Sequence, residues 1–216
     1  NISIDDPIYE VGTTGFYLSY HNQNNKSVMQ SLAKLFIKAC PSLVFESEHC
    51  RPERRKEKRI LRVGFISAFF RNHTIGKLAH GLIKHLSRDR FEVFVFRPVG
   101  MDDRMSKIID SCADKVVALT GTLETDHEIV ASAKLDILYY PEIGMSPHMY
   151  FMAFARLAPI QVTTWGHPDT TGIPNVDYYL SSKLIEIADA SGHYSEQLVT
   201  LKTVPTYYVH PDPPKN

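Results

Sequence analysis

The fold of this chain is indicated most strongly by the stretch Leu61-Arg-Val-Gly-Phe-Ile-Ser-Ala-Phe-Phe-Arg-Asn-His73. Its first half has the apolar pattern of a buried strand, and its second half is a polar loop that ends in a histidine. A helix pattern begins directly afterwards, near Gly76 and Lys77. In an open α/β sheet, ligands and catalytic groups lie in the loops that leave the carboxyl ends of the strands. The stretch therefore predicts a strand, a loop and a helix that present an imidazole where chemistry usually takes place.

Strand and helix patterns alternate along the chain after residue 60. The strand patterns cover 61–67, 91–96, 115–119, 136–140, 160–165 and 177–181, with a further apolar strand after Glu196. The helix patterns cover 77–88, 102–112, 123–134 and 148–157. This alternation predicts an α/β fold with a Rossmann-like, doubly wound, mostly parallel sheet and right-handed crossovers. Before it, apolar residues at three- and four-residue intervals predict an amphipathic helix from Ser27 to Cys40, capped by Asn25 or Ser27.

Three parts are expected along the chain. Residues 1–59 are predicted to form a helical lead-in and a basic linker, residues 60–204 the Rossmann-like domain, and residues 205–216 a Pro-rich connection to a further domain. Together with a first residue that is not methionine, this connection predicts a piece of a longer protein. The basic run Arg51–Arg59 is predicted to be a solvated linker, with contact to phosphate as the alternative.

The composition limits the classes of function. Lys plus Arg and Asp plus Glu number 24 each, so the net charge gives no sign of a nucleic-acid partner. No apolar run approaches the roughly 18 residues of a membrane span, so no membrane partner is expected. Cys40, Cys50 and Cys112 form an odd, widely spaced set, which indicates a reduced compartment, and we expect the cytoplasm.

Common nucleotide and metal motifs are missing from the sequence. No G-x-G-x-x-G follows the first strand and no Walker A sequence occurs, which disfavours a nicotinamide dehydrogenase and a P-loop enzyme. The ten histidines form no H-x-x-x-H pair, and there is no Asp-x-Asp. We therefore expect neither a metal nor a cofactor.

Two polar loops carry the candidate site residues. In the first, His73 has an imidazole that titrates near 6.5 and can both accept and donate, Asn72 is placed to orient the ring, and Thr74 is placed to cap the helix. The second follows the strand at 160–165 and contains Gly166, His167, Pro168, Asp169, Thr170, Thr171 and Gly172. Its glycines permit close approach by a ligand, and its polar side chains offer contacts. The alternatives are a structural histidine and a tight turn without a ligand.

Several motifs, in the same order along the chain, resemble those of the O-GlcNAc transferase and Spindly-type family, glycosyltransferase family 41. They are Arg62-Val-Gly-Phe-Ile-Ser67, Arg71-Asn-His73, Phe91-Glu-Val-Phe94, Ala158-Pro-Ile-Gln161, Gly166-His-Pro-Asp-Thr-Thr-Gly172 and His193-Tyr-Ser-Glu196. Phe16-Tyr-Leu-Ser-Tyr20 also looks like the helical lead-in that follows the tetratricopeptide repeats of the family. The resemblance implies a GT-B architecture of two facing Rossmann-like halves, with this chain as the amino-terminal half.

The resemblance also implies an activity. Members transfer a sugar with inversion and without a metal, typically GlcNAc from UDP-GlcNAc, to Ser or Thr of cytoplasmic or nuclear proteins. His73 matches the active-site histidine of the family, and Gly166 and Pro168 match the loop that packs beside the donor sugar. The implied partners are a carboxyl-terminal catalytic half, a nucleotide sugar and an acceptor protein or peptide. Without that half, we expect this chain to turn over no donor.

The sequence departs from the family pattern in two places. Phe69 stands four residues before His73, where many members have an acidic residue, and the Tyr and Lys of animal members are missing near Gly144-Met-Ser146. These departures leave open a non-catalytic binding module with the same fold. A GT-B enzyme that glycosylates Asn or a small molecule is a further alternative.

Overall fold

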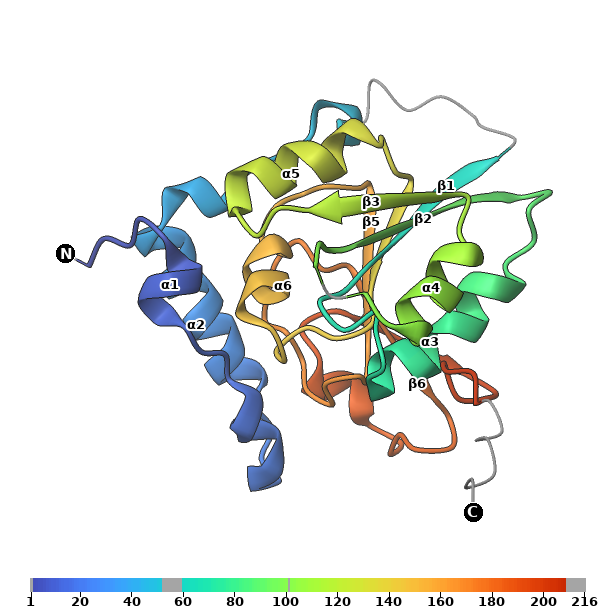
Figure 1. Ribbon diagram of the computed structural model, residues 1–216. Coiled ribbons are helices and arrows are strands. Elements are labelled where there is room, and N and C mark those ends of the chain that lie inside the picture. The colour runs from blue at the N-terminus through green and yellow to red at the C-terminus, as the bar shows by residue number, and fades with distance from the viewer. Residues whose placement is uncertain (1, 52–59, 101, 209–216) are drawn as a thin grey trace, which may run out of the picture.

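The computed structural model describes residues 2–51, 60–100 and 102–208. Its centre is one seven-stranded parallel sheet with the strand order β3-β2-β1-β4-β5-β6-β7 (Figure 1). The strands are β1 Leu61–Ile66, β2 Phe91–Pro98, β3 Lys115–Leu119, β4 Ile137–Tyr140, β5 Ile160–Thr164, β6 Tyr178–Ser182 and β7 Gln197–Leu201. The direction of winding reverses between β1 and β4, which is the doubly wound arrangement. The predicted fold class is confirmed.

Helices cover both faces of the sheet (Figure 1). The α-helices are α1 Pro7–Val11, α2 Lys26–Ala39, α3 Thr74–His85, α4 Arg104–Ser111, α5 Leu123–Ser132 and α6 Pro147–Met152. The 3-10 helices are η1 Phe16–His21, η2 Pro41–Leu43, η3 Glu48–Cys50 and η5 Ala190–His193. One core cluster joins the sheet to α3 and α4, and a larger one joins it to α2, α5 and α6.

The strand β2 shows why the sequence forms a sheet that is covered by helices on both faces. Val93 and Val95 belong to the cluster beneath α3 and α4, whereas Phe94 and Phe96 belong to the opposite cluster. Because successive side chains point to opposite faces, a strand that is covered on both sides must be apolar without interruption. The continuous apolar run at this position therefore signals a central strand of a parallel sheet.

The largest differences from the predicted helix ends are in α3 and α6. α3 begins at Thr74, before the predicted start near Gly76, because the side chain of His73 caps it. α6 ends at Met152 instead of extending to residue 157. After it, the backbone of Arg156 pairs with the segment around Glu46, which is incompatible with a continuing helix.

The short helix α1 was not predicted, although its signals are local. The carboxylate of Asp6 accepts hydrogen bonds from the amides of Ile8 and Tyr9, Pro7 occupies the first turn, and Gly12 ends the helix with a φ of 61°. The amphipathic helix expected at residues 27–40 is present as α2. Asn25 is at its N-cap position, but the side chain of Asn25 makes no capping hydrogen bond.

The lead-in shares the larger core with the sheet. Met29 and Ala33 of α2 are buried in that cluster, and the ring of Phe36 lies 5.3 Å from that of Phe151 in α6. The expected boundaries at residues 59 and 204 stay predictions. Residues 52–59 of the basic run and most of the expected connection at 205–216 lie outside the described residues. Within the described ranges, no helix is both long and apolar enough to cross a membrane.

Candidate active site

The loops that follow β1 and β5 meet at the carboxyl edge of the sheet. Thr74 and Ile75 line a mainly apolar cavity of about 170 Å³ together with Trp165 and Gly166. A Cβ atom on Gly166 would lie 2.1 Å from the carbonyl oxygen of Pro141 and 2.8 Å from Cδ1 of Ile75. Only a glycine fits this close approach. The sequence expectation that both loops lie on one edge therefore agrees with the geometry.

His73 is the N-cap of α3. Its Nδ1 atom accepts a hydrogen bond from the amide of Ile75 at 3.2 Å, so Thr74 is not the cap, contrary to the sequence prediction. The imidazole stacks on the ring of Phe69, with 4.5 Å between centroids and 28° between planes. Burial lowers the pKa of His73, and the positive charges of Arg71 and Lys77 lower it further.

These contacts fix the tautomer of the ring. Because Nδ1 accepts from Ile75, the single proton of the neutral imidazole of His73 resides on Nε2. With its lowered pKa, the ring is neutral at physiological pH. His73 therefore offers an N–H donor from Nε2 at the rim of the sheet.

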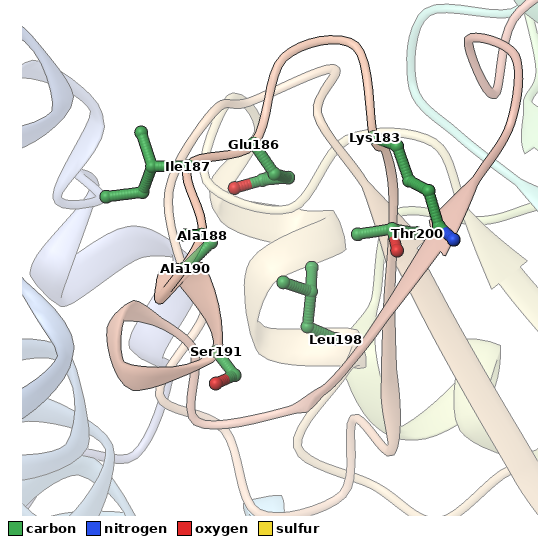
Figure 2. Close-up of a pocket in the computed structure, with 8 residues that line it drawn as sticks. All are labelled: Lys183, Glu186, Ile187, Ala188, Ala190, Ser191, Leu198 and Thr200. Atoms are coloured by element: carbon green, nitrogen blue, oxygen red, sulfur yellow. The ribbon is translucent and has the colours of Figure 1, made fainter.

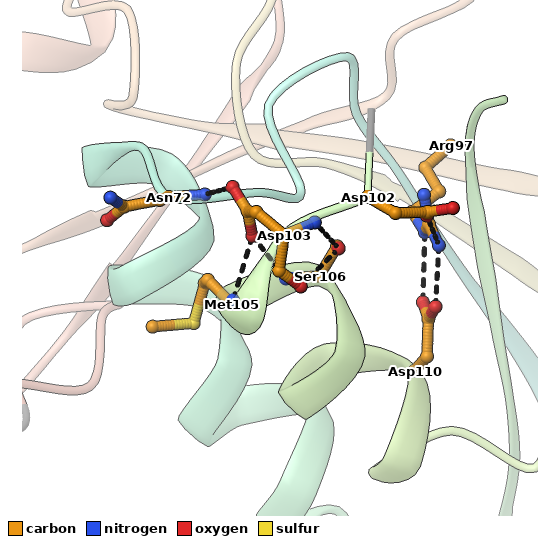
Figure 3. A network of polar contacts seen from close by, with 7 residues as sticks. All are labelled: Asn72, Arg97, Asp102, Asp103, Met105, Ser106 and Asp110. Atoms are coloured by element: carbon orange, nitrogen blue, oxygen red, sulfur yellow. Dashed lines mark hydrogen bonds and ion pairs between the residues drawn. The ribbon is translucent and has the colours of Figure 1, made fainter. Parts of the chain in front are cut away.

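The loop after β1 is tied to the loop after β2 (Figure 3). The backbone amide of Asn72 donates to the carboxylate of Asp103 at 2.5 Å. Asp103 also caps α4 by accepting from the amides of Met105 and Ser106, and its pKa is lowered by these bonds, that from Asn72 most of all. Beside it, Arg97 pairs with Asp102 at 2.7 Å and Asp110 at 2.6 Å. The structure thus engages Asn72 through its backbone, while Phe69 and Ile75 contact the imidazole of His73.

In the second loop, His167 points inward. It is 3% exposed, its Nε2 atom lies 3.1 Å from the carbonyl oxygen of Phe16, and the two rings are 5.2 Å apart. Its own carbonyl oxygen accepts from the hydroxyl of Tyr179 at 3.1 Å. A Cβ atom on Gly144, whose φ is 111°, would lie 2.6 Å from Nδ1 of His167. His167 therefore connects this loop to the lead-in and to the loop after β4, whereas Pro168 is exposed.

The threonines of this loop are bonded to the segment before β7. The hydroxyl of Thr170 donates to Glu196 at 2.7 Å, and the amide of Thr171 donates to the same carboxylate at 2.8 Å. The hydroxyl of Thr171 donates to it as well. Gly172 donates its amide to the hydroxyl of Ser195 at 3.0 Å. Its φ is 71°, and because it has no Cβ atom it packs closely on the backbone of α2. These groups hold the shape of the loop.

Sequence reasoning missed Glu142, which follows β4. Its side chain is completely buried, and its Oε1 atom accepts a hydrogen bond of 2.5 Å from the hydroxyl of Ser67, directly after β1. Burial raises the pKa of Glu142 to about 8, against the opposing effects of the hydroxyl of Ser67 and the backbone amide of Ala68. The two residues lie at the reversal point of the sheet, where ligands bind in folds of this type. The only sequence signal is an acidic residue inside an apolar run, Tyr139-Tyr-Pro-Glu-Ile143.

A larger cavity of about 400 Å³ lies between the segment after β6 and strand β7 (Figure 2). It is lined by Lys183, Glu186, Ile187, Ala188, Ala190, Ser191, Leu198 and Thr200. None of the residues predicted for the site lines it. Its carboxylate, that of Glu186, already accepts from Ser181 at 2.5 Å and from Tyr194 at 2.8 Å. Across residues 2–51, 60–100 and 102–208, no group of three His, Cys, Asp or Glu side chains could hold a metal ion.

Among solved structures, the chain is similar to a mutant of the O-GlcNAc transferase of Thermobaculum terrenum. The TM-score is 0.74 with 22% sequence identity, over 93% of this chain and 39% of that one. At this identity the similarity supports the shared fold.

Among curated proteins, the chain is 28% identical over 149 residues to the probable UDP-N-acetylglucosamine–peptide N-acetylglucosaminyltransferase SPINDLY of Arabidopsis thaliana. The alignment covers 67% of this chain and 16% of that protein. It is also 28% identical over 147 residues to the Arabidopsis thaliana protein SEC of the same description, over 65% of this chain and 15% of that protein. The chain thus spans about a sixth of the length of these relatives.

The sequence profile described as Glycosyl transferase family 41 matches residues 16–211, which include both candidate loops and part of the lead-in. The chain therefore belongs to glycosyl transferase family 41.

Proposed function

We propose that this chain is the amino-terminal half of the catalytic region of an inverting, metal-independent protein O-glycosyltransferase. The reaction is the transfer of GlcNAc or a related sugar from a nucleotide sugar to Ser or Thr of a cytoplasmic protein. The family membership and the names of the curated relatives support the donor and the acceptor class. The observation that carries the proposal is the position of His73 at the carboxyl edge of the sheet, where it caps α3 directly before Thr74 and Ile75, which line one cavity together with Gly166.

His73 acts in this proposal by aligning oxygen atoms. Its Nε2–H donates a hydrogen bond to an oxygen of the acceptor or of the donor sugar. Removal of a proton from the acceptor at Nε2 would require the other tautomer, in which Nδ1 carries a proton and can no longer cap Ile75. Correct orientation of reacting groups is a large source of rate enhancement, and a misplacement of 1 Å can reduce the rate about 100-fold.

The second loop shapes the sugar pocket. Gly166 and Pro168 are the parts of the loop that we place against the donor sugar, since Gly166 lines the cavity beside α3 and Pro168 is exposed. The other residues of the loop stabilise its conformation: His167 and Gly172 contact the lead-in, and Thr170 and Thr171 donate hydrogen bonds to Glu196. The charge that develops on the leaving diphosphate must be stabilised by groups of a carboxyl-terminal half. Residues 1–216 alone are therefore expected to turn over no donor.

The test is a donor screen on the complete protein, with the intact mass of candidate acceptors as the readout. A mass increase of one sugar that is lost on β-elimination supports O-glycosylation, whereas a stable increase indicates linkage to Asn. His73→Ala should reduce the transfer rate by about 100-fold. His85→Ala is the matched control, because His85 is exposed at the opposite end of the same helix. Activity of His73→Ala within about twofold of wild type would remove the proposed role of His73.

A non-catalytic binding module is the second candidate. It is favoured by Phe69, which stacks on His73 at the position where many members of the family have an acidic residue. The same screen separates the two functions, because a module would bind a nucleotide sugar in a calorimetric titration without any mass change of the acceptor.

A further inference from the structure

We propose that Glu142 and Ser67 form a buried clamp that positions the loop carrying His73. The inference rests on the proposed function for its catalytic readout, and on the protein alone for its structural readout. Glu142 is a positioning residue in this scheme, because it acts on the imidazole through other residues.

The clamp joins the two strands at which the sheet reverses. Ser67 directly follows β1, and Glu142 lies two residues after the end of β4. Both residues are 0% exposed, and their side chains meet at 2.5 Å. Burial of a carboxyl group is destabilising unless it is hydrogen-bonded, so this bond fixes the distance between the two loops.

A continuous series of contacts leads from the clamp to the imidazole. The hydroxyl of Ser67 accepts a hydrogen bond from the amide of Phe69 at 2.9 Å. The carbonyl oxygen of Phe69 accepts from the amide of Arg71 at 2.7 Å, and that of Arg71 accepts from the amide of His73 at 2.6 Å. The ring of Phe69 also stacks on the imidazole. A shift of Ser67 is therefore transmitted to His73 through both the backbone and a ring.

The second oxygen of Glu142 indicates the protonation state in which the clamp works. Oε2 is buried and has no hydrogen-bond partner among the described residues, although the backbone amide of Ala68 lies near the carboxyl group and opposes the rise of its pKa. A negative charge would be unfavourable at that position, whereas a neutral carboxyl group, which accepts the bond from Ser67 at Oε1 and carries its proton on Oε2, is buried at a lower cost in free energy. The raised pKa agrees with this geometry. Glutamine has the same shape and is neutral, its amide oxygen can accept the bond from Ser67, and its amide nitrogen is a donor at the position of the Oε2 hydroxyl of the neutral carboxyl group. Glu142→Gln should therefore leave the clamp intact.

The catalytic arm of the test compares three variants of the complete protein. Ser67→Ala and Glu142→Leu remove the clamp, and Glu142→Gln keeps it. We expect the first two to lower kcat by about 10- to 100-fold with a KM within about twofold of wild type, and Glu142→Gln to behave as wild type. A Glu142→Gln protein as impaired as Glu142→Leu would overturn the positioning role, since it would show that the carboxyl group itself is needed.

The structural arm needs no sugar transfer, so it remains decisive if the proposed function fails. The pKa of His73 is measured by NMR on histidine-labelled protein, with His73→Gln to assign the signal. In Ser67→Ala and Glu142→Leu it should rise toward the ordinary imidazole value, because the ring loses the packing that lowers it. An unchanged pKa of His73 in Ser67→Ala would overturn the proposal. Circular dichroism checks folding, and Ser67→Cys replaces any Ser67→Ala protein that does not fold.

Discussion

The ionisation of Glu142 should make the stability of the protein depend on pH in a way that one substitution abolishes. Glu142→Gln keeps the size of the side chain and its bond to Ser67 but cannot lose a proton. Burial raises the pKa of Glu142 from 4.5 to about 8. The stabilising effect of its neutral form is therefore complete below pH 4.5 and is lost as the pH rises to about 8. Over that interval, wild type should weaken relative to Glu142→Gln.

The magnitude follows from the two pKa values of Glu142. Each pH unit between them corresponds to about 1.36 kcal/mol. Relative to its value below pH 4.5, the difference in the free energy of unfolding between Glu142→Gln and wild type should therefore grow by roughly 3 kcal/mol at pH 7 and roughly 5 kcal/mol above pH 8. This is a large part of the roughly 5–15 kcal/mol that stabilises a typical domain. If the free energy of unfolding falls by about 2 kcal/mol per M of urea, the larger value separates the urea midpoints of the two proteins by roughly 2.5 M.

The assay is urea unfolding of wild type and Glu142→Gln at several pH values from about 4 to about 9, followed by circular dichroism. Using the difference between the two proteins cancels the other groups that titrate in this range. Glu128→Gln, at an exposed position of α5, controls for the loss of one carboxylate from the net charge. A difference between Glu142→Gln and wild type that stays constant across this range would refute the reasoning.

Three further predictions concern the residues at the edge of the sheet. Gly166→Ala should lower both the melting temperature and the transfer rate, because its Cβ would lie 2.1 Å from the carbonyl oxygen of Pro141; a melting temperature equal to that of wild type would show that the loop moves freely. Thr171→Val should reduce the free energy of unfolding by about 1–3 kcal/mol, as measured in urea, because the buried Glu196 loses a hydrogen bond. Since the pKa of His73 is lowered, its neutral form should persist below pH 6.5, and the stabilising cap on α3 should be lost only as the pH falls through that lowered value. Amide exchange of Ile75 at decreasing pH measures this loss, and exchange that does not change with pH would contradict it.

The order and type of the elements were readable from the sequence because buried parallel strands are apolar without interruption and the helices between them are amphipathic. The sequence also indicated that the loops of His73 and Gly166 share one edge, because the carboxyl ends of parallel strands lie together, and the roles of the two residues stay predictions. Glu142 was missed, since its burial depends on contacts between β1 and β4 that the local sequence does not encode. Thr170 and Thr171 have the composition of ligand contacts, but Glu196 takes their hydrogen bonds from a segment 25 residues further on. The sequence shows which side chains can form hydrogen bonds, whereas the partner of each bond depends on the tertiary structure.

The lead-in contacts and stabilises the loops around the candidate site, although its sequence alone suggests a separate helical segment. Thr14 donates its hydroxyl proton to the carbonyl oxygen of Gly144, in the loop after β4. Phe16 contacts His167, and the backbone at Met29 lies where any side chain on Gly172 would have to go. The loops after β4 and β5 are thus both contacted by residues that precede the sheet. If the loop that begins at Gly166 shapes the sugar pocket, these contacts set its position, and a fragment that starts at residue 60 should retain the strands but lose the order of the rim.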